Sequence, residues 1–108
     1  MNVGIDLVQI SRFKKIPYTG NESFYQKNFS NEEIKYCLKY NEPYKHFAGK
    51  FAIKEAVKKS IKEKLNLSDI ITFHNKRKPY VKIKKKDLKL EVSVSHDGDY
   101  AIAIVISE

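Results

Sequence analysis

The sequence predicts a single α+β domain over residues 1–108, with a long central helix and shorter helices packed on an antiparallel sheet. Three observations support this fold class. A strand pattern opens the chain, helical patterns fill its middle, and a run of strand patterns closes it. A length of 108 residues suits one domain, and an apolar fraction of 42% is typical of globular proteins.

The opening stretch "NVGIDLVQI" alternates in a way typical of a strand. Val3, Ile5 and Leu7 fall on one face, while Asp6 falls on the other among mostly apolar neighbours. A carboxylate is therefore expected on a largely apolar face. A short basic helical turn, "SRFKKI", is expected before Pro17.

The clearest local signal is a helix start in "FSNEEIKYCLKY". Ser30 and Glu33 match the S-x-x-E capping box, and Phe29 and Ile34 occupy the positions of a hydrophobic staple. The helix is expected to end near Asn41, ahead of a proline. Its apolar face is expected to hold Ile34, Cys37 and Leu38.

The long helix is expected over residues 44–65. Apolar groups nearly encircle its first half, which indicates a central, largely buried helix. Glu55 projects to the same side as Phe51 and two alanines, so we expect a cation to lie near its carboxylate. The helix lysines fall into one edge row and a group flanking Glu55: Lys50, Lys54 and Lys58, then Lys59 and Lys62.

The remainder of the chain reads as strands. Four are expected, over residues 69–75, 78–84, 90–96 and 100–106. Between the last two, Asp97-Gly98 is predicted to fill the two turn positions of a hairpin, because these residues tolerate positive φ.

Charge and composition limit the functional classes. Lys and Arg number 21 against 13 Asp and Glu, which favours acidic or polyanionic partners. The single cysteine excludes an internal disulfide and a Cys-based zinc site. No apolar run approaches the roughly 18 residues of a membrane span, and the N-terminus carries a carboxylate too early for a signal peptide. A soluble cytoplasmic protein without a membrane partner is expected.

Asp6 and Glu55 are the candidate chemical groups. Each carboxylate could pair with a nearby lysine, or both could share one divalent cation. Two carboxylates suit magnesium, which leaves its remaining positions to water and substrate phosphates. The lysines around Glu55 would then hold those phosphates. His96, at the end of a strand, could be catalytic or merely structural.

Three stretches together resemble the holo-acyl-carrier-protein synthases, which are small 4'-phosphopantetheinyl transferases. "VGIDLVQISRF" resembles their opening motif, "FAGKFAIKEAVKKSI" their K-E-A helix, and "VSVSHDGDYAIAIVI" their closing S-H-D/E hairpin. "FSNEEIKYC" fits the helix between the first two. The stretches cover most of the chain in the family's order. The chain departs from the pattern at Gln9, where Glu is common, in "SIKEKLNLSDI", which lacks glycine, and at Arg77.

The resemblance implies a reaction. The 4'-phosphopantetheine group of coenzyme A would pass to a serine of apo acyl carrier protein, with release of 3',5'-ADP, in fatty acid biosynthesis. Asp6 and Glu55 would be the catalytic, Mg²⁺-binding acids, and Glu55 or its water would take the serine proton. Arg12 would contact the carrier protein. The family also implies a homotrimer with sites at subunit boundaries. The implied coenzyme A-binding residues are Lys50, Lys54, Lys59, Lys78, Pro79 and His96.

Two other functions stay open. The lysines, seven tyrosines and six phenylalanines could belong to a nucleic-acid-binding module. However, the charge is diffuse along the chain, and such a module leaves Asp6 and Glu55 unexplained, so no nucleic-acid partner is expected. The chain could also be an inactive transferase-like binding protein, for which Gln9 is the main argument.

Overall fold

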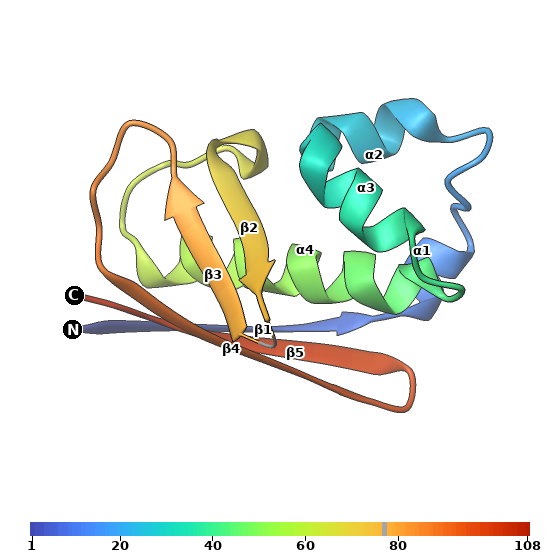
Figure 1. Cartoon of the computed structure of the whole chain (residues 1–108). Coiled ribbons are helices and arrows are strands. Elements are labelled where there is room, and N and C mark those ends of the chain that lie inside the picture. Colours follow the sequence, from blue (N-terminus) through green and yellow to red (C-terminus); the bar gives the residue numbers. More distant parts are fainter. Residues whose placement is uncertain (77) are drawn as a thin grey trace.

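The computed structural model describes residues 1–76 and 78–108 and contains helices and strands in the predicted order (Figure 1). Residues 1–60 are mostly helical apart from the opening strand. Residues 70–107 are mostly strand. The elements are β1 (Asn2–Gln9), α1 (Ser11–Lys14), α2 (Glu22–Asn28), α3 (Asn31–Leu38), α4 (Pro43–Ser60), η1 (Leu67–Asp69), β2 (Ile70–Asn75), β3 (Lys78–Ile83), β4 (Leu90–Asp97) and β5 (Tyr100–Ser107).

The prediction of an α+β fold with antiparallel strands is confirmed, although the strands divide between two sheets. Strands β1, β5 and β4 form one antiparallel sheet in that order, so β1 and β4 are its edges. Strands β2 and β3 form a separate antiparallel hairpin. Helix α4 lies along the first sheet, and the hairpin packs against α4 and beside β4 (Figure 1).

Helix α4 is central and buried, as its sequence pattern predicts. From Phe47 to Val57 every residue is buried except Phe51 and Glu55, which are half-buried, so little of the middle of the helix contacts solvent. The helix ends at Ser60 rather than at residue 65, because Ile61 adopts an extended backbone. Two side chains satisfy carbonyls at this end: Ser60 Oγ donates to Val57 O, and Ser107 Oγ donates to Ser60 O.

The predicted capping box at the start of α3 is confirmed. The Glu33 backbone N–H donates to Ser30 Oγ, and the Glu33 carboxylate accepts from the Ser30 N–H at 2.7 Å. The helix ends three residues earlier than expected, in a tight turn where the Tyr40 N–H donates to Cys37 O. Leu38, which was expected on the apolar face, is exposed because it lies at this end of the helix.

The turn between β4 and β5 falls one residue later than predicted. Asp97 pairs with Tyr100, so the two turn residues are Gly98 and Asp99. Gly98 has a φ of 57°, which explains the need for glycine at the first turn position. Asp97 belongs to the strand.

The sheet face turned away from α4 is apolar and exposed. We call it the outer sheet face and define it by Val3, Ile5, Leu7, Ile102 and Ile104. The residues of β1 and β5 stand opposite one another in register, with Ile5 beside Ile104. A contiguous apolar face of this kind usually marks a contact with another molecule. Among the described residues, no helix has the length and apolar character needed to cross a membrane.

Candidate active site

Strand β1 and helix α4 approach each other so closely at Gly4 that only glycine fits. A Cβ atom there would collide with the carbonyl oxygen of Ala56 and would lie 2.8 Å from the backbone nitrogen of Ser60. The two elements run in opposite directions, because Phe13, which follows β1, packs on Phe51, which precedes Ala56 in α4, with ring centroids 5.5 Å apart. This crossing fixes which residues face each other.

The crossing brings Asp6 to the level of Glu55. Asp6 is two residues beyond Gly4 on the same face of β1, a rise of about 6.7 Å. An α-helix needs about four residues to cover that distance. Gly4 faces Ala56 and Ser60, and four residues before these positions lies the turn of α4 that holds Glu55. Two acids separated by 49 positions in the chain therefore border the same part of the β1–α4 crossing.

Lys59 holds Asp6 in this structure. Its Nζ lies 3.0 Å from Asp6 Oδ1 and donates to the backbone oxygen of Ile5 at the same distance. The Asp6 side chain is 15% exposed and that of Lys59 is 55% exposed, so the pair sits at the rim of the site. Lys59 follows Glu55 by one helical turn and shares its flank of α4. Glu55 itself has no cationic partner within 4 Å in the described part of the chain.

The donor set suits a hard divalent cation. Asp6 and Glu55 supply carboxylate oxygens, both side chains are half-buried, and β1 is an edge strand, which leaves one side open. Within residues 1–76 and 78–108, no cluster of three or more His, Cys, Asp or Glu has the geometry of a metal site. Protein ligands would thus number two, and water or substrate oxygens would supply the others.

The predicted role of Lys54 on coenzyme A phosphates is not supported, because this lysine is buried inside the fold. Lys54 Nζ pairs with the Glu33 carboxylate at 2.7 Å and donates to the backbone oxygens of Asn28 and Leu67. Burial lowers the pKa of Lys54, although the charge of Glu33 opposes that change. Its ammonium group has no exposed surface from which to reach a ligand.

Lys50 is also buried, but it lacks an acidic partner. The residue is 2% exposed, and its Nζ lies 3.1 Å from Thr72 Oγ1 and 4.5 Å from the centre of the Tyr36 ring. Among the described residues, no carboxylate lies within ion-pair distance of it. Burial lowers the pKa of Lys50. A buried ammonium with only neutral partners favours the binding of an anion.

Lys50 lines a small cavity that also receives three histidines. The cavity has a volume of about 30 Å³ and is lined by Tyr36, His46, Gly49, Lys50, Ile53, His74, Val94 and His96. His46 stacks on Tyr40, and His74 stacks on Tyr36. Burial, assisted by nearby lysines, lowers the pKa of His46 and of His74 to about 4. His96 is more exposed, and its Nε2 lies 3.0 Å from the backbone oxygen of Lys45.

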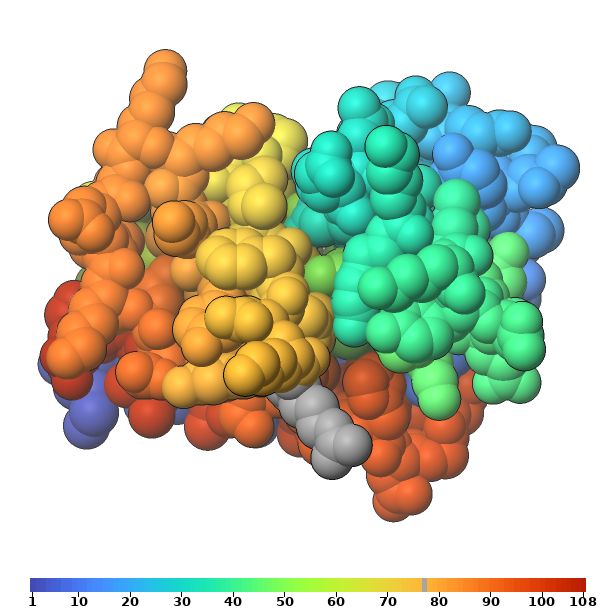
Figure 2. All heavy atoms as spheres, viewed as in Figure 1, coloured from blue at the N-terminus to red at the C-terminus, as the bar shows by residue number. Residues whose placement is uncertain are grey.

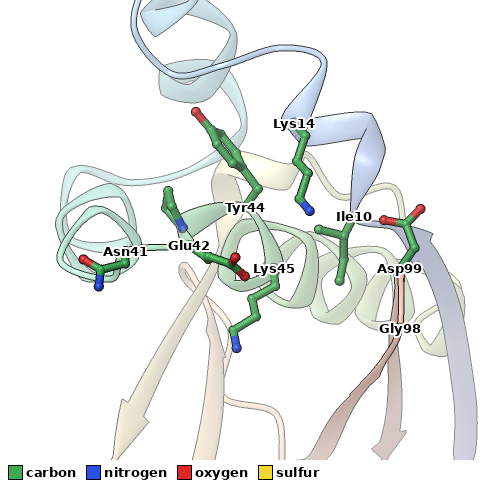
Figure 3. A pocket seen from close by; sticks show the side chains of 9 residues that line it. Ile10, Lys14, Asn41, Glu42, Tyr44, Lys45, Gly98 and Asp99 are labelled. Carbon is green, nitrogen blue, oxygen red and sulfur yellow. The ribbon is translucent and has the colours of Figure 1, made fainter.

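A larger pocket of about 270 Å³ lies at the other side of the first turn of α4 (Figure 3). Lys14 reaches toward it from α1 and Lys45 borders it from α4, while Asp99 turns toward α1, where its Oδ1 accepts the Ser11 N–H. Since Lys45 also contacts His96, the pocket and the cavity adjoin along α4. The pocket is lined by Ile10, Lys14, Asn41, Glu42, Pro43, Tyr44, Lys45, Gly98 and Asp99.

The other predicted site residues lie apart from these groups. Lys78 is exposed on the outer face of the β2–β3 hairpin, with its Nζ 5.6 Å from the centre of the Tyr80 ring. Pro79 is half-buried on the inner face, opposite His74. The guanidinium of Arg12 lies over the Phe51 ring. Arg77, where the sequence departs from the family pattern, lies outside the described residues.

Sequence reasoning missed the second role of Glu33. The capping box identified this residue as a local cap, but its carboxylate also binds Lys54 and both donors of Thr72. The cluster of His46, His74 and Tyr36 was also missed, because its members come from three different elements. One signal was available in the sequence: Thr72 is a polar residue at an inward position of an apolar strand, which indicates a buried hydrogen-bond partner.

Comparison with known proteins identifies the class. A family model described as the 4'-phosphopantetheinyl transferase superfamily matches residues 2–105, and the chain belongs to this superfamily. A holo-acyl-carrier-protein synthase of Thermodesulfovibrio yellowstonii is 39% identical, over 96% of this chain and 95% of the relative. One of Geobacter sulfurreducens is 36% identical, over 97% and 94%. The resemblance seen in the sequence is thus confirmed, and the chain is an enzyme of the phosphopantetheinyl transferase class.

Solved structures agree with this assignment. The chain is similar to a Helicobacter pylori holo-acyl-carrier-protein synthase, determined in complex with coenzyme A, with a TM-score of 0.82 and 31% identity over 98% of this chain and 99% of that one. It also shares its fold with a synthase from Bacillus anthracis, with a TM-score of 0.85 and 24% identity over 99% and 95% of the two chains.

Proposed function

We propose that residues 1–108 form one transferase domain that moves 4'-phosphopantetheine from coenzyme A to a serine of apo acyl carrier protein. The reaction depends on Mg²⁺, releases 3',5'-ADP and serves fatty acid biosynthesis in the cytoplasm. The observation that supports this proposal is the bond between Lys59 and Asp6 at the close crossing of β1 and α4, because Lys59 lies one helical turn after Glu55.

Asp6 and Glu55 are the proposed metal ligands. A bound Mg²⁺ would supply positive charge that offsets the charge developing on the pyrophosphate. Lys59 already donates to Asp6 and is more than half exposed. It can leave the carboxylate and donate to a phosphate oxygen at the rim of the site. Glu55, or a water molecule held by it, is the proposed base that takes the proton of the carrier serine, because no lysine or arginine among the described residues pairs with this carboxylate.

Lys50 and His96 are the proposed contacts for other phosphate groups of coenzyme A. A buried ammonium without an acidic partner gains its missing counter-charge when a phosphate binds. The Helicobacter pylori relative, which binds coenzyme A, supports this choice of substrate. Lys78 and Pro79 remain proposed contacts from the hairpin, whereas Lys54 is assigned to the fold.

The carrier protein is proposed to approach α1, where Arg12 is exposed. The formal charge of +8 would attract an acidic carrier. A homotrimer is proposed as the assembled form, and the exposed outer sheet face is the observation that supports it. Covering that face would bury the row of apolar side chains on β1 and β5.

A mass-spectrometric assay tests the proposal. The protein is incubated with coenzyme A, MgCl₂ and apo acyl carrier protein, and the carrier is weighed. We expect a gain of the phosphopantetheine mass that disappears with a chelator. Glu55→Gln should lose at least about 100-fold in rate, whereas Glu32→Gln, an exposed acid on α3, should retain it. Near-normal turnover by Glu55→Gln would refute the assigned role.

A further inference from the structure

The segment of residues 70–86, which contains the β2–β3 hairpin, carries the most concentrated positive charge in the chain. Between Asp69 and Asp87 the sequence has seven Lys or Arg and no acidic residue. The hairpin stands at the molecular surface in front of α4 (gold to orange in Figure 2). Part of the charge, which looked diffuse along the sequence, therefore falls on β3, which holds Lys78 and Lys82, and on the segment that follows it.

Two aromatic rings lie at the centre of this basic hairpin. Phe73 and Tyr80 stand opposite each other in the strand register, and their rings stack with centroids 5.6 Å apart and an angle of 16° between their planes. Both side chains face outward and are exposed, at 38% and 37%. Cross-strand aromatic rings on a sheet surface form a platform on which a flat, unsaturated group can stack.

Lysines stand before and after the aromatic pair. Lys78 and Lys82 lie two residues to either side of Tyr80 on the same face of β3, about 6.7 Å away along the strand in each direction. Lys78 Nζ is 5.6 Å from the Tyr80 ring centre, and Lys82 Nζ is 5.9 Å from that of Phe73. The order along the hairpin is cation, aromatic pair, cation.

We infer that this outer hairpin face, defined by Phe73, Lys78, Tyr80 and Lys82, binds single-stranded nucleic acid. A nucleotide within a strand has a flat base with a phosphate on each side, and this matches the order of groups on the hairpin. Carboxylates on an acidic protein helix do not alternate with flat aromatic groups. A duplex does not fit either, because its base faces are already stacked.

The inference does not rest on the proposed transferase function. It reverses the expectation from sequence that no nucleic acid is a partner, because the strand register brings together rings that are seven positions apart in the chain. The metal-site acids Asp6 and Glu55 belong to the β1–α4 crossing, not to the hairpin. Binding can therefore be measured without coenzyme A or magnesium.

Fluorescence anisotropy with a labelled oligonucleotide of ten thymidines tests the inference. Phe73→Leu/Tyr80→Leu keeps apolar side chains but removes the rings, and it should weaken binding about 5-fold to 100-fold, as expected for the loss of base stacking. Phe73→Leu and Tyr80→Leu are also made singly, in case the double variant does not fold. The matching ten-base-pair duplex should compete less well than the single strand.

Charge variants give a second readout. Lys82→Ser should lower the slope of log affinity against log salt by about 0.7, the value for one phosphate contact on a single strand. Lys27→Ser, which removes an exposed lysine from α2, should leave the slope unchanged. Unchanged binding by the leucine variants, or equal effects of the two lysine variants, would overturn the inference. If the leucine variants lose binding of the apo carrier protein but still bind the oligonucleotide, the outer hairpin face is assigned to an acidic protein instead.

Discussion

Glu33→Gln should destabilise the protein more than any change at its exposed acids. The Glu33 carboxylate accepts from four donors: Lys54 Nζ at 2.7 Å, the Ser30 N–H at 2.7 Å, and the N–H and Oγ1 of Thr72 at 2.8 and 2.5 Å. The side chains of Glu33 and Lys54 are both fully buried. These bonds join α3, α4 and β2 at one point.

The size of the effect follows from this burial. Removing one partner of a buried ion pair leaves the other charge uncompensated and costs about 3–5 kcal/mol. The total stability of a domain is about 5–15 kcal/mol, so the loss is a large part of it. The glutamine amide would also direct an N–H₂ group at groups that donate. Because about 1 kcal/mol changes the melting temperature of such a domain by at least about 4 °C, a decrease of more than about 12 °C is expected.

Thermal and urea unfolding followed by circular dichroism measure the effect. Glu32→Gln, at the exposed neighbouring position, is the matched control and should change stability by less than about 0.5 kcal/mol. Glu33→Leu/Lys54→Met removes both charges and should cost less than the sum of the two single changes. A loss below about 1 kcal/mol for Glu33→Gln would refute the assignment of this pair as a major support of the fold.

Three further predictions concern pH, assembly and substrate. Because the folded-state pKa of His46 and His74 is lowered to about 4, the unfolded chain binds protons first. Stability should therefore fall as pH decreases from about 6.5 toward 4, and replacing both with Gln should flatten that profile in urea titrations. Ile5→Lys and Ile104→Lys should convert the proposed trimer to monomer by light scattering; an unchanged mass would contradict the role of the outer sheet face. Lys50→Met should raise KM for coenzyme A at least about 10-fold in steady-state kinetics. An unchanged KM in this variant would contradict the role of Lys50.

The sequence predicted what depends on local pattern. The capping box of Ser30 and Glu33, the alternation of β1 and the apolar surround of α4 all follow from spacing within one element. The end of α4 was placed five residues too late, because the carbonyl of Ser60 is satisfied by Ser107 at the other end of the chain. No local pattern contains that contact.

Roles that depend on contacts between elements could not be read in the same way. The K-E-A motif identifies Lys54 and Glu55 as neighbours, yet successive helix positions point about 100° apart. The structure directs Lys54 into the core, toward Glu33, and leaves Glu55 on the half-buried flank beside β1. A buried lysine and a site acid thus follow each other in the chain, and only the position of α3 tells them apart.

Gly4→Ala should separate the metal-site acids without altering either of them. The added Cβ would collide with the backbone oxygen of Ala56, and backbone cannot rotate away as a side chain can. Strand β1 must therefore move from α4, taking Asp6 away from Glu55. Gly49→Ala is the control, because its Cβ would lie 3.0 Å from His96 Nε2, at the end of a side chain that can shift.

If the acids act together on one ion, Gly4→Ala should lose phosphopantetheine transfer and require more magnesium for what remains. The control Gly49→Ala should keep the wild-type magnesium dependence even if it raises KM for coenzyme A. Titrating MgCl₂ at saturating coenzyme A separates the two effects, and circular dichroism verifies that the variants are folded. A folded Gly4→Ala protein with unchanged magnesium dependence would show that the close crossing of β1 and α4 does not set the geometry of the site.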